Sequence, residues 1–272
     1  MARLSSYAPG TPSYVDLMTT DMDAAKAFYG ALFGWTGEPS PYPEAMGYTP
    51  MMLGDAHAAG IGPTFTDAPP CWNTYVTTAD VEATLASATA AGGKVIVEPM
   101  DVFDDGRMGG IMDPGGAALM LWQPLNHIGS QVRAEPGALS WVELNTRNAA
   151  RSKEFYGTLF GWTFNDEQIP ASESSPGYVY TQILLGAAAV GGMLQMDQSW
   201  PAELPEHWMV YFSVADCGAA AAQVTELGGD VCVPPTDIPP GRFAVVNDGQ
   251  GATFTIIALS PEVLAHMAGQ AD

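Results

Sequence analysis

The stretch that decides the fold is FYGALFGW at residues 28–35, because it recurs as FYGTLFGW at residues 155–162. The match extends backwards without a gap. SYVDLMTTDMDAAKAFYGALFGW from Ser13 aligns with SWVELNTRNAARSKEFYGTLFGW from Ser140, and 12 of these 23 positions are identical. Self-similarity over such a length indicates a tandem duplication.

The duplication continues to the end of each half. WNTYVTTADVEATLASATAAGG from Trp72 matches WMVYFSVADCGAAAAQVTELGG from Trp208. Between the halves runs QPLNHIGSQVRAEPGA, whose polar, Pro and Gly residues are typical of a linker. We therefore predict four segments along the chain: copy one at 1–124, a linker at 125–137, copy two at 138–262 and a tail at 263–272.

Hydrophobic periodicity predicts the same order of elements twice within each copy. Asp21 is expected to cap the first helix and Gly34 to end it, while Gly54-Asp55 is a hairpin signal. In copy one the expected helices are 22–33 and 81–91, and the expected strands are 14–19, 48–53, 56–61, 73–78, 94–99, 108–112 and 117–122. The prediction is an α+β chain of four βαβββ modules.

These features together resemble a known superfamily. A Phe-Tyr pair after the first strand, Gly-Gly after the second helix and the turn Asp113-Pro114-Gly115-Gly116 are similar to those of the vicinal-oxygen-chelate superfamily, which includes glyoxalases, bleomycin-resistance proteins and extradiol dioxygenases. The resemblance covers nearly all of the chain. The two fused copies resemble the two-domain actinobacterial group that carries the names hydroxylase and antigen.

The resemblance implies that each pair of modules curls its sheet into a cup that holds a small-molecule ligand. In dimeric members of the superfamily each cup draws on both subunits. We therefore expect the two copies to dock as a pseudo-dimer within one chain and to need no partner chain.

The strongly acidic composition makes nucleic acids and membranes improbable binding partners. The formal net charge is −21, from 9 Lys+Arg against 30 Asp+Glu, and such a surface repels phosphate backbones and anionic lipid. Neither a nucleic acid nor a membrane is expected to bind. Cys71, Cys217 and Cys232 form no short-spaced pair, and no signal peptide is evident, so we predict a cytoplasmic protein.

The repeated motif itself is interpreted as structural. Phe28, Leu32 and Phe33 share one helix face, and Trp35 is expected to begin the next strand. That spacing predicts packing against the sheet without a catalytic role. The same interpretation applies to Phe155, Leu159, Phe160 and Trp162.

The chelate site of the superfamily has no counterpart here. The resemblance implies four ligand positions in each copy, which fall on Tyr14, Ala59-Gly60, Asn73 and Met120 in copy one and on Trp141, Gly191-Gly192, Met209 and Thr255 in copy two. None is an acid or an imidazole. His57, His127, His207 and His266 share no ligand spacing and are interpreted as surface or capping groups. We predict no metal and no cofactor.

Strand alternation gives the residues expected to line each cup, because i and i+2 share a face. Copy one contributes Tyr14, Asp16, Met18, Asn73, Tyr75, Thr77, Met120 and Trp122, and copy two contributes Trp141, Glu143, Asn145, Met209, Tyr211, Ser213, Thr253 and Thr255. Asp16 and Glu143 are the candidate catalytic residues. The candidate ligand-binding residues are Tyr14, Asn73, Tyr75, Met120 and Trp122 in copy one and Trp141, Asn145, Met209, Tyr211, Thr253 and Thr255 in copy two.

A carboxylate inside a cup has three interpretations. It is a structural acceptor, bonded to backbone amides or to Arg107 or Arg242; or a general base with a raised pKa; or a partner for a cationic ligand. The two arginines are expected to pair with Asp104, Asp105 or Asp237 at the strand edges. A ligand-facing anion clamp is the alternative.

Two functions from different classes follow. One is a metal-independent enzyme of lyase or hydroxylase type that acts on a small aromatic or carbonyl-bearing metabolite. The other is a binding protein that sequesters a drug or metabolite without catalysis, as the bleomycin-resistance proteins imply. Turnover separates them, because a sequestering protein leaves its ligand unchanged.

Overall fold

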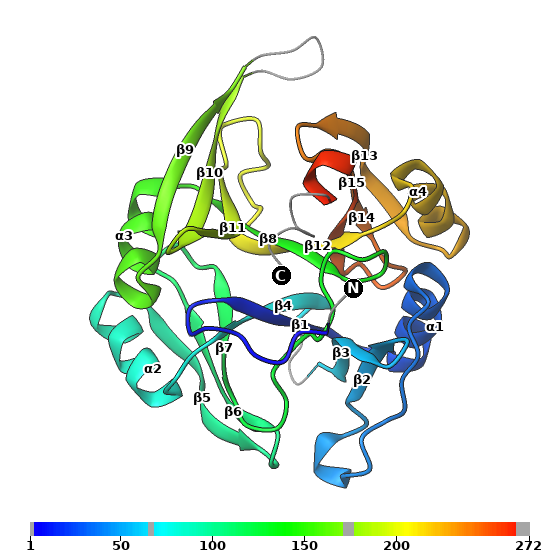
Figure 1. Cartoon of the computed structure of the whole chain (residues 1–272), viewed down its shortest axis with the longest axis horizontal. Helices are drawn as coiled ribbons and strands as arrows, with labels where there is room; N and C mark the ends of the chain where they lie inside the picture. Colours follow the sequence, from blue (N-terminus) through cyan, green and yellow to red (C-terminus); the bar gives the residue numbers. More distant parts are fainter. Residues whose placement is uncertain (1–2, 65–67, 171–176, 265–272) are drawn as a thin grey trace.

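Each copy folds around one mixed sheet in the computed structural model, which describes residues 3–64, 68–170 and 177–264 (Figure 1). The strand order is β2-β3-β1-β4-β7-β6-β5 in copy one and β13-β14-β15-β12-β8-β11-β10-β9 in copy two. In the described ranges, no strand of one copy enters the sheet of the other. Each cup is therefore built from the strands of a single copy.

The bounds of the elements follow the predicted order closely. Copy one contains β1 (Pro12–Thr19), α1 (Met22–Phe33), a 3-10 helix η1 (Pro43–Ala45), β2 (Thr49–Leu53), β3 (Ala56–Pro63), β4 (Cys71–Thr77), α2 (Val81–Ala90), β5 (Lys94–Val102), β6 (Gly106–Met112) and β7 (Ala118–Pro124). Copy two contains β8 (Leu139–Thr146), α3 (Ala149–Phe160), β9 (Thr163–Ile169), β10 (Tyr178–Leu185), β11 (Ala188–Gln195), β12 (His207–Ser213), α4 (Cys217–Glu226), β13 (Asp230–Ile238), β14 (Gly241–Asn247) and β15 (Thr253–Leu259).

The first module departs from the predicted pattern. Trp35 does not begin a full strand, since only an isolated bridge from Thr36 to Met52 forms there, whereas copy two has the strand β9 at the equivalent place. The predicted cap is confirmed: Asp21 accepts from the amide of Ala24, and Gly34 ends α1 in the left-handed region at φ 73°.

The two faces of each sheet bury different side chains. Val15 and Leu17 of β1 belong to the main core together with helix residues such as Phe28 and Leu85. Tyr14 lies on the opposite face of β1, in a separate cluster with Tyr75, Met120 and Trp122. We call the face opposite the helices cup one in copy one and cup two in copy two. The alternation that the sequence predicts is confirmed.

A pair of buried hydrogen-bond chains joins the copies. The Tyr29 hydroxyl of α1 donates to Asp248 Oδ2 in copy two at 3.0 Å and accepts from Trp72 Nε1 at 3.2 Å. The equivalent Tyr156 hydroxyl of α3 donates to Asp113 Oδ2 in copy one at 3.0 Å and accepts from Trp208 Nε1 at 3.0 Å. Helix α1 lies beside α4, and α2 beside α3 (Figure 1).

The repeated motif therefore does more than pack against its own sheet. Its tyrosine bridges to the other copy, and Phe33 lies against Phe212 across the interface at a ring-centroid distance of 5.0 Å. Trp35 Nε1 donates to the Gly137 carbonyl, and Trp162 Nε1 donates to the Gly10 carbonyl, both at 2.7 Å. The interpretation as core residues was right, but it missed that this core is shared.

The two ends of the interface differ in one turn. In copy two Gln250 reaches across to α1, where its Oε1 accepts from Thr19 and from the Asp21 amide. The equivalent residue of copy one is Gly115, and a side chain there would collide with Glu206, since a Cβ would lie 1.9 Å from Glu206 Oε2.

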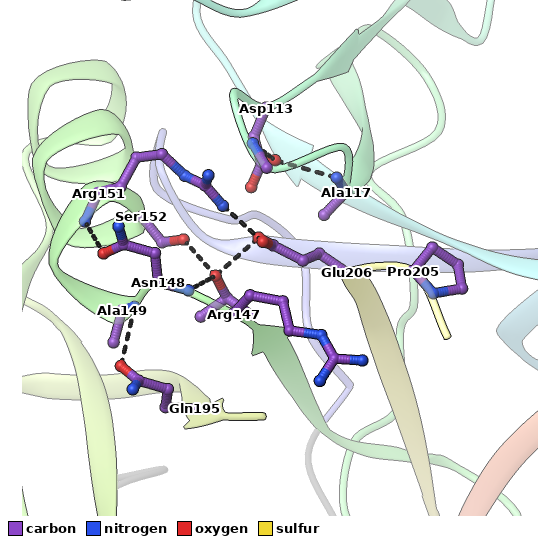
Figure 2. A network of polar contacts seen from close by, with 12 residues as sticks. Asp113, Ala117, Arg147, Asn148, Ala149, Arg151, Ser152, Gln195, Pro205 and Glu206 are labelled. Carbon is purple, nitrogen blue, oxygen red and sulfur yellow. Dashed lines mark hydrogen bonds and ion pairs between the residues drawn. The ribbon is translucent and has the colours of Figure 1, made fainter. Parts of the chain in front are cut away.

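Glu206 fills that space as part of a network of copy two (Figure 2). It accepts from Arg151 at 2.5 Å and from Thr146 Oγ1 at 2.7 Å, close to the Asp113 turn of copy one. The interface between the copies therefore has different polar contacts at its two ends, those of Gln250 at one end and those of Glu206 at the other.

No helix within the described ranges has the length and apolar character needed to cross a bilayer.

The buried hydrogen bonds of Tyr29 predict that Tyr29→Phe lowers the stability of the protein more than Tyr42→Phe does. Tyr29→Phe leaves Asp248 Oδ2 and Trp72 Nε1 without this partner, so the free energy of unfolding should fall by about 1–3 kcal/mol. Urea unfolding measures it. Tyr42→Phe is the matched control, because Tyr42 is 48% exposed. Equal stability of the two variants would contradict an energetic role for the bridge.

Candidate functional site

The predicted residues of copy one gather around Asp16, which is 2% exposed. Its carboxylate accepts from Asn73 Nδ2 at 2.9 Å, from the Tyr75 hydroxyl at 2.8 Å and from the Tyr48 hydroxyl at 3.4 Å. Strand register explains this cluster, since Asp16 pairs with Asn73 across β1 and β4, and Tyr14 pairs with Tyr75. Arg107 and Arg242 pair with other carboxylates and are not hydrogen-bond partners of Asp16.

Glu143 occupies the equivalent place in copy two and is 6% exposed. It pairs with Met209, and Trp141 pairs with Tyr211, across β8 and β12. Tyr180 and Tyr211 form hydrogen bonds with the carboxyl group, and so does Asn145. Trp141 Nε1 in turn donates to the Tyr180 hydroxyl at 2.9 Å.

Burial dominates the electrostatics of both acids. Desolvation raises the pKa of Glu143 to about 7, although hydrogen bonds from Tyr180, Tyr211 and Asn145 favour the charged form. Desolvation likewise raises the pKa of Asp16 to about 6 against the hydrogen bonds of its three partners. Glu143 therefore has both protonation states within reach near neutral pH.

Tyr48 and Tyr180 were not predicted, yet they complete the two clusters. A Cβ placed on Gly60 would lie 1.9 Å from the Tyr48 hydroxyl, and one placed on Gly192 would lie 1.9 Å from the Tyr180 hydroxyl. The glycines admit these hydroxyls. The available signal was a glycine inside a strand, which often marks the close approach of another group.

The metal implied by the superfamily does not fit this geometry. The glycines stand at the second ligand position, where a tyrosine hydroxyl already fills the space of a ligating side chain. The remaining positions offer no carboxylate or imidazole. Among the residues that the structure describes, no group of three or more His, Cys, Asp or Glu side chains could hold a metal ion.

The histidines require a correction. His127 of the linker and His57 of β3 lie together, with ring centroids 5.0 Å apart, and His127 also packs edge-on against Tyr14 at 4.8 Å. Burial lowers the pKa of His127 to about 4. These are therefore partly buried packing groups of cup one, not surface groups. His266 lies outside the described residues.

The linker runs along cup one and forms hydrogen bonds with its strands. Ser130 Oγ donates to the Ala58 carbonyl at 2.6 Å, the Gln131 amide donates to the His57 carbonyl at 2.7 Å, and Trp122 Nε1 donates to the His127 carbonyl at 2.7 Å. Beyond the linker, Tyr42 stacks on Phe103 at 4.3 Å, so the η1 loop touches the β5–β6 turn.

Cup two is more exposed than cup one at its aromatic pair, although Asn145 and Met209 are buried where their counterparts Met18 and Asn73 are partly exposed. Trp141 and Tyr211 are partly exposed, whereas their counterparts Tyr14 and Tyr75 are buried. Thr255 is buried beside Tyr211 across β12 and β15, but Thr253 is exposed at the start of β15 and bonds to Asn247. The structure thus brings the predicted residues of copy two together, except Thr253.

His207 and Asn145 extend the Glu143 cluster along β8 and β12. Asn145 Nδ2 lies 3.4 Å from His207 Nε2, and His207 Nδ1 lies 2.8 Å from the Pro205 carbonyl oxygen. Sequence reasoning gave His207 a surface or capping role. The register of the two strands, which brings Asn145 opposite His207, shows it to be part of the cluster.

The arginines are edge groups. Arg242 pairs with Asp237 at 3.2 Å as predicted, but Arg107 pairs with Asp101 and Glu82, both at 2.5 Å, and not with Asp104 or Asp105. Asp101 lies directly across from Arg107 in the β5–β6 ladder, which explains why Arg107 pairs with Asp101 and not with Asp104 or Asp105.

Two surface hollows lie away from both cups. One, of about 300 Å³, lies between the copies and is lined by Gly10, Thr77, Asp80 and Phe160 among others. The second is an open depression beside Arg147 and Trp200. Thr77, which was expected to line cup one, borders the first hollow instead and donates to Ser13 Oγ. Neither hollow contains a candidate catalytic or ligand-binding residue, and the Asp80 and Arg147 side chains already bond to backbone groups, so the chemistry points to the cups.

The raised pKa of Glu143 predicts a pH-dependent stability difference. The folded state holds the proton more tightly than the unfolded chain. The stability from this group is therefore fully present below about pH 4.5 and is lost as the pH rises through about 7. Glu143→Gln cannot ionise, so it should exceed wild type by on the order of 1–3 kcal/mol at pH 8.5 and match it near pH 5.

Urea unfolding at both pH values tests this prediction. Glu167→Gln on the exposed β9 is the control and should show no such dependence. A Glu143→Gln variant that is less stable than wild type at pH 8.5 would instead identify Glu143 as a structural acceptor.

Comparisons with known proteins agree with this architecture. The model of the Glyoxalase/Bleomycin resistance protein/Dioxygenase superfamily matches residues 11–121 and 138–256. "Putative glyoxylase CFP32" of Mycobacterium tuberculosis is 41% identical over 268 residues, covering 96% of this chain and all of that protein. The anthracycline biosynthesis protein DnrV of Streptomyces peucetius is 32% identical over 271 residues, covering 94% and 96% of the two chains.

Solved structures show the same fold at low identity. The Mn(II)-bound glyoxalase from Novosphingobium aromaticivorans aligns with a TM-score of 0.62 at 17% identity, covering 94% of this chain and 89% of that one. The 2,3-dioxygenase LapB from Pseudomonas sp. KL28 aligns with a TM-score of 0.61 at 14% identity, covering 95% and 96%. With a match to the family model in each copy, this chain belongs to the glyoxalase/bleomycin resistance protein/dioxygenase superfamily.

Proposed function

We propose that cup two binds a small aromatic molecule that carries a carbonyl group, and that Glu143 transfers a proton on it without a chelated metal. The observation that supports this most is the convergence of Glu143, Tyr180 and Tyr211 on the cup face of copy two. By the resemblance, ligand positions of the superfamily fall on neighbouring residues, Trp141, Gly192 and Met209. A carboxyl group and two hydroxyls supply the base and the hydrogen-bond donors that such chemistry needs.

The residues suggest a balanced proton-transfer step. Ionised Glu143 removes a proton from the carbon beside the carbonyl, and the electron pair of that C–H bond moves to the carbonyl oxygen. Once Glu143 is protonated, the Tyr180 and Tyr211 hydroxyls no longer face a charged acceptor and can donate to the developing enolate oxygen. Return of the proton to another atom gives an isomer and needs no oxidant or reductant.

The surroundings of Glu143 favour an aromatic ligand. Trp141 and Tyr211 are partly exposed rings on the same face, and large flat side chains with a few polar groups are typical of small-molecule sites. A relative whose name assigns it to anthracycline biosynthesis supports a ligand of this class.

Sequestration without catalysis is the second candidate. The observation that favours it is that all three polar neighbours of Glu143 come from the protein, so a ligand could stack on Trp141 without disturbing the carboxyl group. A ligand recovered unchanged at one equivalent per chain would support sequestration over proton transfer.

Hydrogen–deuterium exchange tests the proposed proton transfer directly. The wild-type chain in D₂O should accelerate exchange of the protons beside the carbonyl of an aryl ketone such as deoxybenzoin, followed by NMR. Glu143→Gln should lower that rate about 10²-fold or more, while the exposed control Glu167→Gln keeps it. An equal rate in Glu143→Gln would rule out Glu143 as the base.

The ligand positions predict that divalent metals are not retained. After exposure to Zn, Ni, Mn and Fe and gel filtration, elemental analysis should find far less than one ion per chain, and the exchange rate should survive a chelator. Near-stoichiometric retention of any of these ions, abolished by Tyr180→Ala or Glu143→Gln, would overturn the metal-free assignment.

A further inference from the structure

The tautomer of His207 is set by its own backbone contact. His207 Nδ1 lies 2.8 Å from the Pro205 carbonyl oxygen, which can only accept a hydrogen bond. Nδ1 therefore carries the proton. Burial lowers the pKa of the ring, although the bond to Pro205 opposes this, so the ring is neutral near pH 7. His207 Nε2 is then a lone-pair acceptor.

This acceptor fixes the orientation of the Asn145 amide. Nε2 lies 3.4 Å from Asn145, so the NH₂ group must face His207 and not the oxygen. The same NH₂ group is the end of the amide that can also donate to Glu143. The contact with His207 therefore orients the amide, because a flip would place Oδ1 against the lone pair of Nε2.

The other end of the amide has no partner. Asn145 is 2% exposed, and its Oδ1 is buried with no hydrogen bond to any part of the chain that the structure describes. Asn145 shares the cup face of β8 with Trp141 and Glu143 by strand alternation. A buried acceptor without a donor is destabilising, and a donor that reaches it recovers that free energy.

We propose that Asn145 Oδ1 accepts a hydrogen bond from a hydroxyl or N–H group on the ligand of cup two, adjacent to the carbonyl beside Glu143. The inference rests on the proposed function for its ligand and extends it to specificity. Cup two selects molecules that carry a donor next to the carbonyl and discriminates against analogues that lack it by about tenfold to a hundredfold.

Copy one lacks this arrangement at the matching positions. Met18 stands where copy two has Asn145, and Cys71 stands where copy two has His207, in the same pairing register of the two strands. The carboxylate and a tyrosine pair persist in both copies. Copy one has an amide too, on Asn73, but within the described residues only the Asn145 amide has a buried oxygen without a hydrogen-bond partner. This feature therefore distinguishes cup two from cup one.

The His207 tautomer can be measured on the full-length protein without a ligand. Long-range ¹H–¹⁵N NMR of the histidine ring at pH 7 should show a proton on Nδ1 and a bare Nε2. A proton on Nε2 would turn the amide around, place Asn145 Oδ1 against His207, and overturn the inference.

A matched pair of ligands tests the selectivity. Benzoin and deoxybenzoin are aryl ketones that differ only by the hydroxyl beside the carbonyl, and calorimetry gives both affinities. Wild type should prefer benzoin by about tenfold or more. Asn145→Met, which installs the copy-one side chain, should reduce that preference to near unity while deoxybenzoin still binds. Glu167→Gln should keep the wild-type preference.

The outcomes separate the two proposals. Equal binding of both ketones to wild type, or a preference that survives Asn145→Met, would overturn the role of Asn145 while the proposed function stands. Binding of neither ketone would count against the proposed ligand class and, with it, against the adjacent donor, whereas the tautomer decides the orientation of the amide independently.

Discussion

The buried hydrogen bond from each helix tyrosine to the opposite turn aspartate is the constraint on which the arrangement of the molecule depends. Asp248 accepts from Tyr29 of the other copy and also from the Gln250 and Ala252 amides of its own turn. Asp113 does the same with Tyr156 and with the Gly115 and Ala117 amides. Each aspartate thus orders its own turn and holds the helix of the other copy, so the conformation of the turn and the docking of the copies depend on the same side chain.

This docking directs the cups outward. The helix sides of the two sheets share a core, in which Phe33 meets Phe212 and Phe28 meets Phe254, so the faces that carry Asp16 and Glu143 turn away from the interface. A polar cluster on those faces does not interrupt the shared core. That separation is what allows a chain to keep buried carboxyl groups with raised pKa values in both copies, although each opposes folding at neutral pH.

The predictions that were confirmed rest on short-range signals. The cap at Asp21, the stop at Gly34 and the alternation along β1 each depend on neighbours within a few residues. What was missed depends on pairing between distant segments. Nothing local in the sequence shows that Tyr48 reaches Asp16, since that contact requires the register of β1, β2 and β3.

The same limit explains the errors about polar side chains. His57 and His127 are 70 positions apart and meet because the linker returns along β3, and Arg107 chooses Asp101 because the β5–β6 ladder places them opposite each other. A parity rule places a side chain on a face, but it does not show which part of the chain covers that face. The cover of the aromatic pair is one of the differences between the two otherwise similar clusters.

Because the chain is duplicated, the clusters around Asp16 and Glu143 can differ in their side chains while both copies keep the same fold. The tyrosine bridges, the glycines beneath Tyr48 and Tyr180 and the central carboxyl group recur in both copies, and these groups determine packing. The linker leaves copy one along the cup of that copy, where His127 packs against Tyr14, whereas the counterpart of Tyr14 in copy two, Trp141, is partly exposed. Asn145 is buried although its counterpart Met18 is partly exposed, so the difference at this position lies in the polar contacts of Asn145 and not in its cover. The cups thus differ in two ways: the connecting segment covers the aromatic end of cup one, and the amide and imidazole of Asn145 and His207 change the polar contacts of cup two.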